Sequence, residues 1–203
     1  FHHAVGRRQP VRGVAADALR VAEPVAELRE ALAKDFGVAV FDNASDAVAG
    51  TALWLLAVKP QVMRQVCDDL STVAQSSKPL VVSIAAGITA TQLQRWLGGD
   101  ASIIRAMPNT PALLGAGVTG LYANAHVSAA GRTDAEGLLA SAGKTVWIDD
   151  EALMDAVTAV SGSGPAYIFL LAEAMEAAAK AEGLADGAAR TLVLQTILGA
   201  ARM

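Results

Sequence analysis

Several features that mark whole classes of protein are scarce in this sequence. Cys67 is the one cysteine among 203 residues, so an intrachain disulfide is excluded and a reducing compartment is favoured. The 16 Lys and Arg residues are outnumbered by 20 Asp and Glu residues, which gives a net charge of −4 and no basic patch for nucleic acid. No apolar run reaches the roughly 18 residues of a membrane span, and the N-terminus does not resemble a signal peptide. We therefore expect a soluble, cytoplasmic protein that binds neither nucleic acid nor membrane.

Histidine is also rare and isolated. His2, His3 and His126 have no cysteine or paired carboxylate at the spacing of metal ligands. We expect no metal site.

Short β-rich runs alternate with helical patterns, which is typical of a mostly parallel sheet covered by helices. A continuous apolar run at 53–58 predicts a strand buried on both faces, which Lys59 and Pro60 end. Thr89 and Gln92 form a capping-box pattern at the start of a helix. The expected strands are 19–22, 38–41, 53–58, 80–84, 102–106, 117–122 and 144–148, and the first expected helix is 24–36, stopped by Gly37.

After about residue 150 the pattern changes to helix upon helix. We expect helices at 166–182 and 186–203, separated by Gly183, and divide the chain into a dinucleotide-binding domain, 1–150, and a helical domain, 151–203. An apolar stripe on the last helix favours either internal packing or an interface with a second subunit. Its members are Ala189, Leu192, Val193, Thr196, Ile197 and Ala200.

The junction of the two parts reads VTAVSGSGPAYIFLL over 157–171. Gly162 and Gly164 have no Cβ, and Pro165 suits a first helical position, so the pattern predicts a Ser/Gly turn that opens a helix. Such a helix start can hold an anion or a small polar ligand. The alternative is a tight inter-domain turn with no ligand.

The ends of three expected strands carry residues that suit a dinucleotide. A parallel sheet binds its ligand at the carboxyl ends of its strands. These ends offer a cation at Lys59, a small-residue stretch at 85–87 and an amide at Asn109. Each feature alone also has a structural explanation: Lys59 as a solvated strand end, 85–87 as packing residues and Asn109 as a turn former. Together they predict a dinucleotide-binding crevice.

The phosphate loop of such a crevice is missing from its usual place. A G-x-G-x-x-G pattern occurs at 115–120, but it leads into a β-like stretch and not into a helix. Residues 1–18 contain two glycines, Gly6 and Gly13, and no apolar strand. We expect the first βα unit to be missing or altered.

The chain resembles the pyrroline-5-carboxylate reductase family over about residues 19–203. Four segments carry the resemblance in order: AVKP at 57–60, VVSIAAGIT at 81–89, IIRAMPNTPALLGAG at 103–117 and AVTAVSGSGPAYIF at 156–169. It implies a Rossmann-like dinucleotide-binding domain followed by an all-α dimerisation domain. It also implies an NAD(P)H-dependent oxidoreductase of proline biosynthesis, which transfers a hydride to the C=N bond of 1-pyrroline-5-carboxylate and forms L-proline. A homodimer or higher homo-oligomer is implied as well.

The resemblance also implies the site, with no general acid assigned. The cofactor-binding residues would be Asn43, Ala57, Val58, Lys59, Pro60, Ile84, Ala85 and Ala86, and the substrate-proximal residues Asn109, Ser161, Gly162, Ser163 and Gly164. The family uses NADP, with NAD also possible. Glu23 after the first strand favours NAD, because an acid there binds the ribose 2′-hydroxyl, whereas Arg20 and Arg29 favour NADP.

The sequence differs from the family pattern at two places that matter for activity. The family begins with a glycine-rich loop, and it continues beyond the position of Met203 into a segment that holds the substrate carboxylate. We expect the helical domain to be incomplete and the chain to have little activity alone. The alternatives are a non-catalytic fragment that acts only in oligomer assembly, or another imine or β-hydroxyacid-type reductase.

Overall fold

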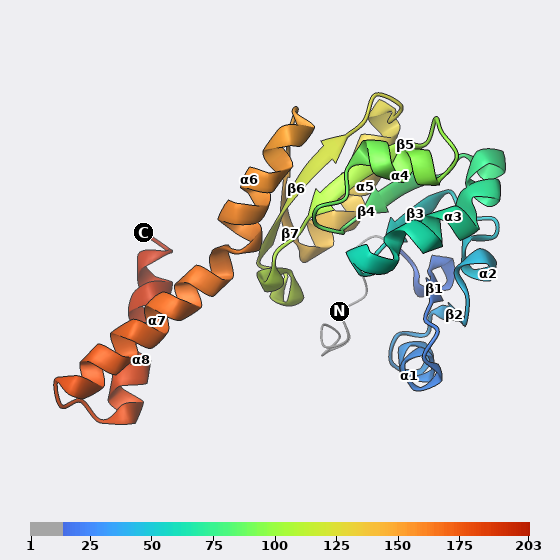
Figure 1. Cartoon of the computed structure of the whole chain (residues 1–203). Coiled ribbons are helices and arrows are strands. Elements are labelled where there is room, and N and C mark those ends of the chain that lie inside the picture. Colours follow the sequence, from blue (N-terminus) through green and yellow to red (C-terminus); the bar gives the residue numbers. More distant parts are fainter. Residues whose placement is uncertain (1–13) are drawn as a thin grey trace.

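The computed structural model describes residues 14–203 (Figure 1). A two-stranded parallel sheet, a mostly parallel five-stranded sheet and their helices form most of the chain, and two long helices form its end. The strands are β1 (Arg20–Ala22), β2 (Ala39–Phe41), β3 (Leu53–Leu56), β4 (Leu80–Ser83), β5 (Ser102–Met107), β6 (Gly117–Ala123) and β7 (Gly143–Trp147). The α-helices are α1 (Ala26–Phe36), α2 (Ala44–Val48), α3 (Pro60–Ser77), α4 (Ala90–Trp96), α5 (Ala129–Leu139), α6 (Met154–Val157), α7 (Gly164–Ala181) and α8 (Asp186–Ala200). Short 3₁₀ turns are η1 (Ala16–Ala18), η2 (Thr110–Leu114), η3 (Ala140–Ala142) and η4 (Glu151–Leu153), and η5 (Thr158–Gly162) is a π-helix.

The larger sheet has the strand order β3-β4-β5-β6-β7. Its neighbours are parallel except for β5 and β6, where Arg105 lies opposite Tyr122 in an antiparallel register. β1 and β2 pair in parallel as a separate sheet. This confirms the expected mostly parallel α/β fold.

Helices cover both faces of the larger sheet (Figure 1). On one face α3 contributes Met63, Cys67 and Leu70, α4 contributes Leu93, and Leu97 follows the end of α4. All five are almost completely buried against the sheet. On the other face Leu139 of α5 packs over Ile104 and Leu121. The core therefore lies in two layers, one on each side of β4 and β5.

The capping box at the start of α4 is confirmed. The Thr89 side chain accepts from the Gln92 backbone N–H, and the Gln92 side chain accepts from the Thr89 backbone N–H. Gly37 ends α1 with a φ of +66°, and Gly183 separates α7 from α8 with a φ of +96°. Both glycines stand where other residues would be strained.

The expected burial of the 53–58 run is wrong. β3 is an outer strand of the five-stranded sheet, and Leu55 is 44% exposed, so this apolar run is not buried on both faces. No residue of α1 is buried, although Leu28 and Leu32 recur at helical spacing. Periodicity identifies the apolar side of a helix but not how much of the chain covers it.

α7 and α8 form a hairpin that extends away from the sheets (Figure 1). Ala189 and Val193 of α8 are buried, whereas Leu192 is 55% exposed. The apolar stripe of α8 thus packs only partly within the chain. No helix within residues 14–203 is both long and apolar enough to cross a bilayer.

Candidate active site

The carboxyl ends of β3, β4 and β5 lie at one edge of the sheet because these strands are parallel. Beyond β4, Ala85 is buried in the core while Ala86 and Gly87 are exposed. Gly87 has a φ of +75° and no heavy atom within 4 Å of the position of a Cβ. Ala86 and Gly87 therefore offer open, nearly bare backbone to a flat ligand.

The end of β3 adds a cation to this edge. Ala57, Lys59 and Pro60 are exposed, and Val58 is half-buried against the core. Lys59 precedes the first residue of α3, Pro60, which needs no N–H partner there. Ile84 joins the two strand ends, because its N–H donates to the Leu56 carbonyl over 3.2 Å.

Asn43 caps α2 through its side chain. Its Oδ1 accepts from the Asp46 N–H over 2.9 Å, and its Nδ2 donates to the carboxylates of Asp42 and Asp46. These bonds hold the amide at the end of β2, and its contact with an adenosine stays a prediction.

The end of β1 is organised around Glu23. Its Oε1 accepts from the Val25 N–H, and Arg29 donates to its backbone carbonyl over 2.8 Å. Arg20 instead donates to the carbonyls of Asp46 and Ala47, and its guanidinium lies 4.2 Å from the centre of the Phe41 ring. Arg20 is thus engaged with α2 and β2, while Glu23 and Arg29 stay together at the strand end.

Asn109 follows β5 and connects it to β6. Its Oδ1 accepts from the Val118 N–H over 3.0 Å, which fixes the amide plane. Since the oxygen is used in this bond, the Nδ2 hydrogens are the part of Asn109 that a ligand would meet.

The Ser/Gly turn predicted before Pro165 is wrong. Thr158–Gly162 is a π-helix, closed by a 2.8 Å bond from the Ser163 N–H to the Thr158 carbonyl, and it joins α6 to α7. Pro165 lacks an N–H and crowds the carbonyl four residues earlier, and a wider turn accommodates it. α7 nevertheless begins at Gly164 with Pro165 in its first turn, as predicted, but a π-helix and not a Ser/Gly turn leads into it.

α6 and the π-helix pack against the sheet at two glycines, Gly120 of β6 and Gly162 of the π-helix. A Cβ on Gly162 would lie 2.6 Å from Cε of Met107, and a Cβ on Gly120 would lie 2.6 Å from Cγ1 of Val157. The structure therefore brings Gly162 onto Met107 at the end of β5, two residues before Asn109. Ser161 donates its hydroxyl hydrogen to the Val157 carbonyl.

A buried ion pair is the part of this region that sequence reasoning missed. Nη1 of Arg105 on β5 lies 2.9 Å from Oε1 of Glu151 on η4, and the same oxygen accepts from the Ala90 N–H over 2.6 Å. The two side chains are 9% and 22% exposed. Their separation of 46 positions left no local signal.

The G-x-G-x-x-G pattern at 115–120 is not a phosphate loop. Gly117 and Gly120 lie in β6, as the β-like sequence predicted, and a Cβ on Gly117 would lie 2.7 Å from the Ala112 backbone. The altered segment expected at 1–18 falls mostly outside the described residues, and so do His2 and His3. Within residues 14–203 no group of three His, Cys, Asp or Glu side chains suits a metal ion.

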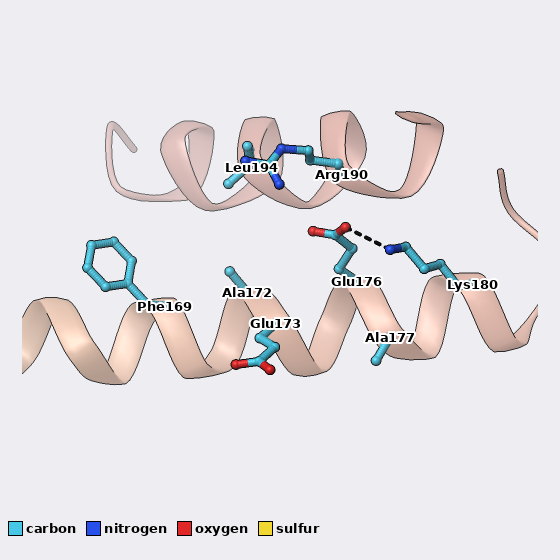
Figure 2. Close-up of a pocket in the computed structure, with 8 residues that line it drawn as sticks. All are labelled: Phe169, Ala172, Glu173, Glu176, Ala177, Lys180, Arg190 and Leu194. Atoms are coloured by element: carbon cyan, nitrogen blue, oxygen red, sulfur yellow. Dashed lines mark ion pairs between the residues drawn. The ribbon is translucent and has the colours of Figure 1, made fainter. Parts of the chain in front are cut away.

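A separate hollow of about 450 Å³ lies between α7 and α8 (Figure 2). Glu176 and Lys180 form an ion pair of 3.0 Å on its wall, and Phe169 lies at the other end of the same helix face. The hydrogen bond that Lys180 donates to the Glu176 carboxylate is the main cause that raises the pKa of Lys180 above its ordinary value. The hollow lies in the hairpin, away from the strand ends.

Known proteins match both parts of the chain. Residues 151–203 match the family described as pyrroline-5-carboxylate reductase dimerisation, and residues 7–87 match the family described as NADP oxidoreductase, coenzyme F420-dependent. A pyrroline-5-carboxylate reductase of Pseudomonas aeruginosa is 50% identical over 192 residues, which are 95% of this chain and 70% of that protein. The enzyme of Haemophilus influenzae is 45% identical over 192 residues, again 70% of its length.

Solved structures agree with the sequence matches. The pyrroline-5-carboxylate reductase of Coxiella burnetii superposes with a TM-score of 0.90 at 37% identity, over 94% of this chain and 71% of that chain. The Plasmodium falciparum enzyme, solved with NADP bound, gives a TM-score of 0.76 at 31% identity, over 82% of this chain and 62% of that chain. On the strength of the common fold and half-identical sequence, the chain belongs to the pyrroline-5-carboxylate reductase family.

Proposed function

We propose that the edge formed by β3, β4 and β5 binds NADP and serves the reduction of the C=N bond of 1-pyrroline-5-carboxylate to L-proline. The observation that carries the proposal is the contact of Gly162 with Met107. Met107 ends β5 two residues before Asn109, and Ala86 and Gly87 follow the end of the neighbouring parallel strand β4. This arrangement supports the proposal that cofactor-side and substrate-side residues from distant parts of the sequence meet at one edge of the sheet.

The cofactor side has the shape and chemistry that a dinucleotide needs. Ala57, Ala86 and Gly87 leave backbone exposed for a ribose or a flat ring, and Lys59 provides positive charge for a phosphate. Val58, Pro60, Ile84 and Ala85 shape this edge, and Asn43 lies toward the adenosine. We name NADP first because the Plasmodium falciparum relative binds it and residues 7–87 match an NADP oxidoreductase family. Glu23 beside Arg29 leaves NAD as a second cofactor.

The reduced nicotinamide, when bound, supplies the hydride, so the protein's own task is orientation. Asn109 is held by Val118 and presents its Nδ2 hydrogens to a polar substrate group. Ser161, Gly162, Ser163 and Gly164 form the opposite wall, where small side chains leave room for a five-membered ring. An electrophilic C=N carbon needs placement against the nicotinamide more than it needs a strong base.

The hairpin of α7 and α8 serves assembly in this proposal. The dimerisation match covers 151–203, and the hairpin exposes large apolar side chains, among them Phe169 at 68%, Leu170 at 67% and Leu192 at 55%. Such a surface suits a second copy of the chain. We assign 1–150 to the dinucleotide-binding domain, 151–203 to the dimerisation domain of a homodimer or larger homo-oligomer, and the protein to the cytoplasm.

NADPH fluorescence provides the test, because it reports binding and oxidation separately. The purified chain is titrated with NADPH and NADH, and 1-pyrroline-5-carboxylate is then added, with 1-pyrroline, which lacks the carboxylate, as the matched control. Saturable binding followed by oxidation with the carboxylated imine supports the proposal. Absence of binding at millimolar cofactor contradicts the cofactor assignment. Because the chain alone is expected to have little activity, slow oxidation that is faster with the carboxylated imine still supports the reductase, and oxidation at equal rates with both imines contradicts it.

A further inference from the structure

We propose that Arg105 and Glu151 are positioning residues, which hold two walls of the proposed site at a fixed separation. The cofactor wall is Ala86–Ala90, and the substrate wall is 158–164. The inference rests on the proposed function for what the two walls bind. The contacts that carry it are those of a single oxygen, Oε1 of Glu151, which accepts from both the Ala90 N–H and Nη1 of Arg105.

The Ala90 bond holds the cofactor wall. Ala90 is the first residue of α4 and follows Gly87 by three residues. Its N–H is one of the groups that a helix start leaves without a partner in the helix. At 2.6 Å the Glu151 carboxylate supplies that partner from 61 positions further along the chain. The position of the small-residue stretch is thereby tied to η4.

η4 in turn leads directly into the substrate wall. Glu151 lies three residues before Met154, the buried first residue of α6, and α6 runs into the π-helix that carries Ser161 and Gly162. Val157 then packs on Gly120 of β6. A shift of Glu151 relative to the sheet therefore moves the start of the helix that forms this wall.

Arg105 connects Glu151, and with it both walls, to the sheet. The register places it opposite Ser83 at the end of β4 and opposite Tyr122 on β6, so it lies on the sheet face that α4 covers. A largely buried ion pair is weak evidence for stability, because well-packed apolar residues often serve as well. Unlike apolar residues, the pair defines the geometry between three separate elements, β5, α4 and η4.

The experiment compares Glu151→Ala, Glu151→Asp and Glu151→Gln, with Asp149→Ala as the matched control on an exposed neighbouring carboxylate. Glu151→Asp keeps the charge but withdraws it by one methylene, so it cannot reach both donors and remains informative if Glu151→Ala does not fold. Glu151→Gln keeps an acceptor oxygen at the same distance. All variants are measured at a temperature where circular dichroism shows them folded.

Amide hydrogen exchange is the first readout and does not depend on activity. We expect exchange at Ala86–Ala90 and at 158–164 to accelerate together, by about tenfold or more, in Glu151→Ala and Glu151→Asp, and to return toward wild type in Glu151→Gln. Exchange that changes in one wall only, or in neither, overturns the proposal.

Catalysis is the second readout. For folded variants we expect kcat to fall by about 100-fold with little change in the KM for the imine, because a misplacement of about 1 Å costs that much in rate. A variant that is folded and keeps the wild-type kcat overturns the positioning role. If the wild-type chain neither binds nor oxidises NADPH, the proposed function fails, and the exchange result alone decides whether the pair couples the two walls.

Discussion

Gly120 lies directly under Val157, so that a Cβ on the glycine would stand 2.6 Å from Cγ1 and 3.2 Å from Cγ2 of the valine. The contact joins β6 to the end of α6. Valine is stiff at χ1 and cannot turn aside at low cost. The absence of a side chain at position 120 is therefore what lets the helical part approach the sheet.

Gly120→Ala is expected to destabilise the protein by about 1–3 kcal/mol, as overpacking of a filled core does. Chemical denaturation measures the loss. Gly137→Ala is the matched control, because Gly137 lies within α5 with nothing within 4 Å of its Cβ position, and alanine there is expected to stabilise by up to about 1 kcal/mol. The double variant Gly120→Ala/Val157→Ala should be less destabilised than the sum of its single changes. Simple additivity would show that the contact does not cause the loss.

Cys67 should be unreactive in the folded protein. It is fully buried, and burial, with a smaller contribution from Asp68, raises the pKa of its thiol from the ordinary 9.0 to about 11. Iodoacetamide at pH 8 is expected to leave the native chain unmodified and to alkylate it after unfolding. Rapid alkylation of the native chain would mean that α3 opens locally.

The raised pKa of the Cys67 thiol makes the stability of the protein depend on pH between about pH 9 and pH 11. Because the folded pKa is raised, the thiol contributes its stabilisation fully below pH 9 and loses it as the pH rises toward 11. The free energy of unfolding of the wild type, relative to Cys67→Ala, should fall across this window by at most about 1.4 kcal/mol per pH unit. A constant difference from pH 8 to pH 11 would contradict it.

Much of the fold can be predicted from the sequence because its signals are local. Alternating apolar patterns predicted every strand of the five-stranded sheet to within two residues, and the Thr89 and Gln92 pair predicted the start of α4. Strand ends in turn predicted the place of Lys59 and Asn109 at one edge. These features depend on residues within a few positions of each other.

Contacts between distant residues account for what could not be predicted. Glycines around Pro165 normally indicate a turn, but Gly162 packs on Met107, 55 positions away, and the segment stays helical as a π-helix. Arg105 in β5 and Glu151 show no pattern in the sequence, since each has meaning only when the fold places it beside the other. Sequence periodicity likewise cannot show that α1 is left uncovered.

Leu170→Glu is expected to weaken self-association. Leu170 is 67% exposed on α7, within the 151–203 segment that matches a dimerisation family, and a charge there must be desolvated in any interface. Sedimentation velocity should show a shift from dimer or larger oligomer toward monomer at equal concentration. Leu114→Glu is the control, because Leu114 is 86% exposed on η2, outside that segment. If both variants stay associated, the interface lies elsewhere.

Substitutions of Asn109 can distinguish a structural role of its side chain from a role in substrate binding. Its Oδ1 accepts from Val118, so Asn109→Asp keeps the acceptor and loses the Nδ2 donor, whereas Asn109→Ala loses both. We expect Asn109→Asp to keep near-wild-type stability while its kcat/KM for the imine falls by about tenfold or more, and Asn109→Ala to lose about 1 kcal/mol of stability as well. Thermal unfolding and NADPH oxidation measure the two effects independently. Full activity in Asn109→Asp would show that the amide serves the β5–β6 connection alone, since the aspartate can still hold Val118 but cannot donate to a substrate.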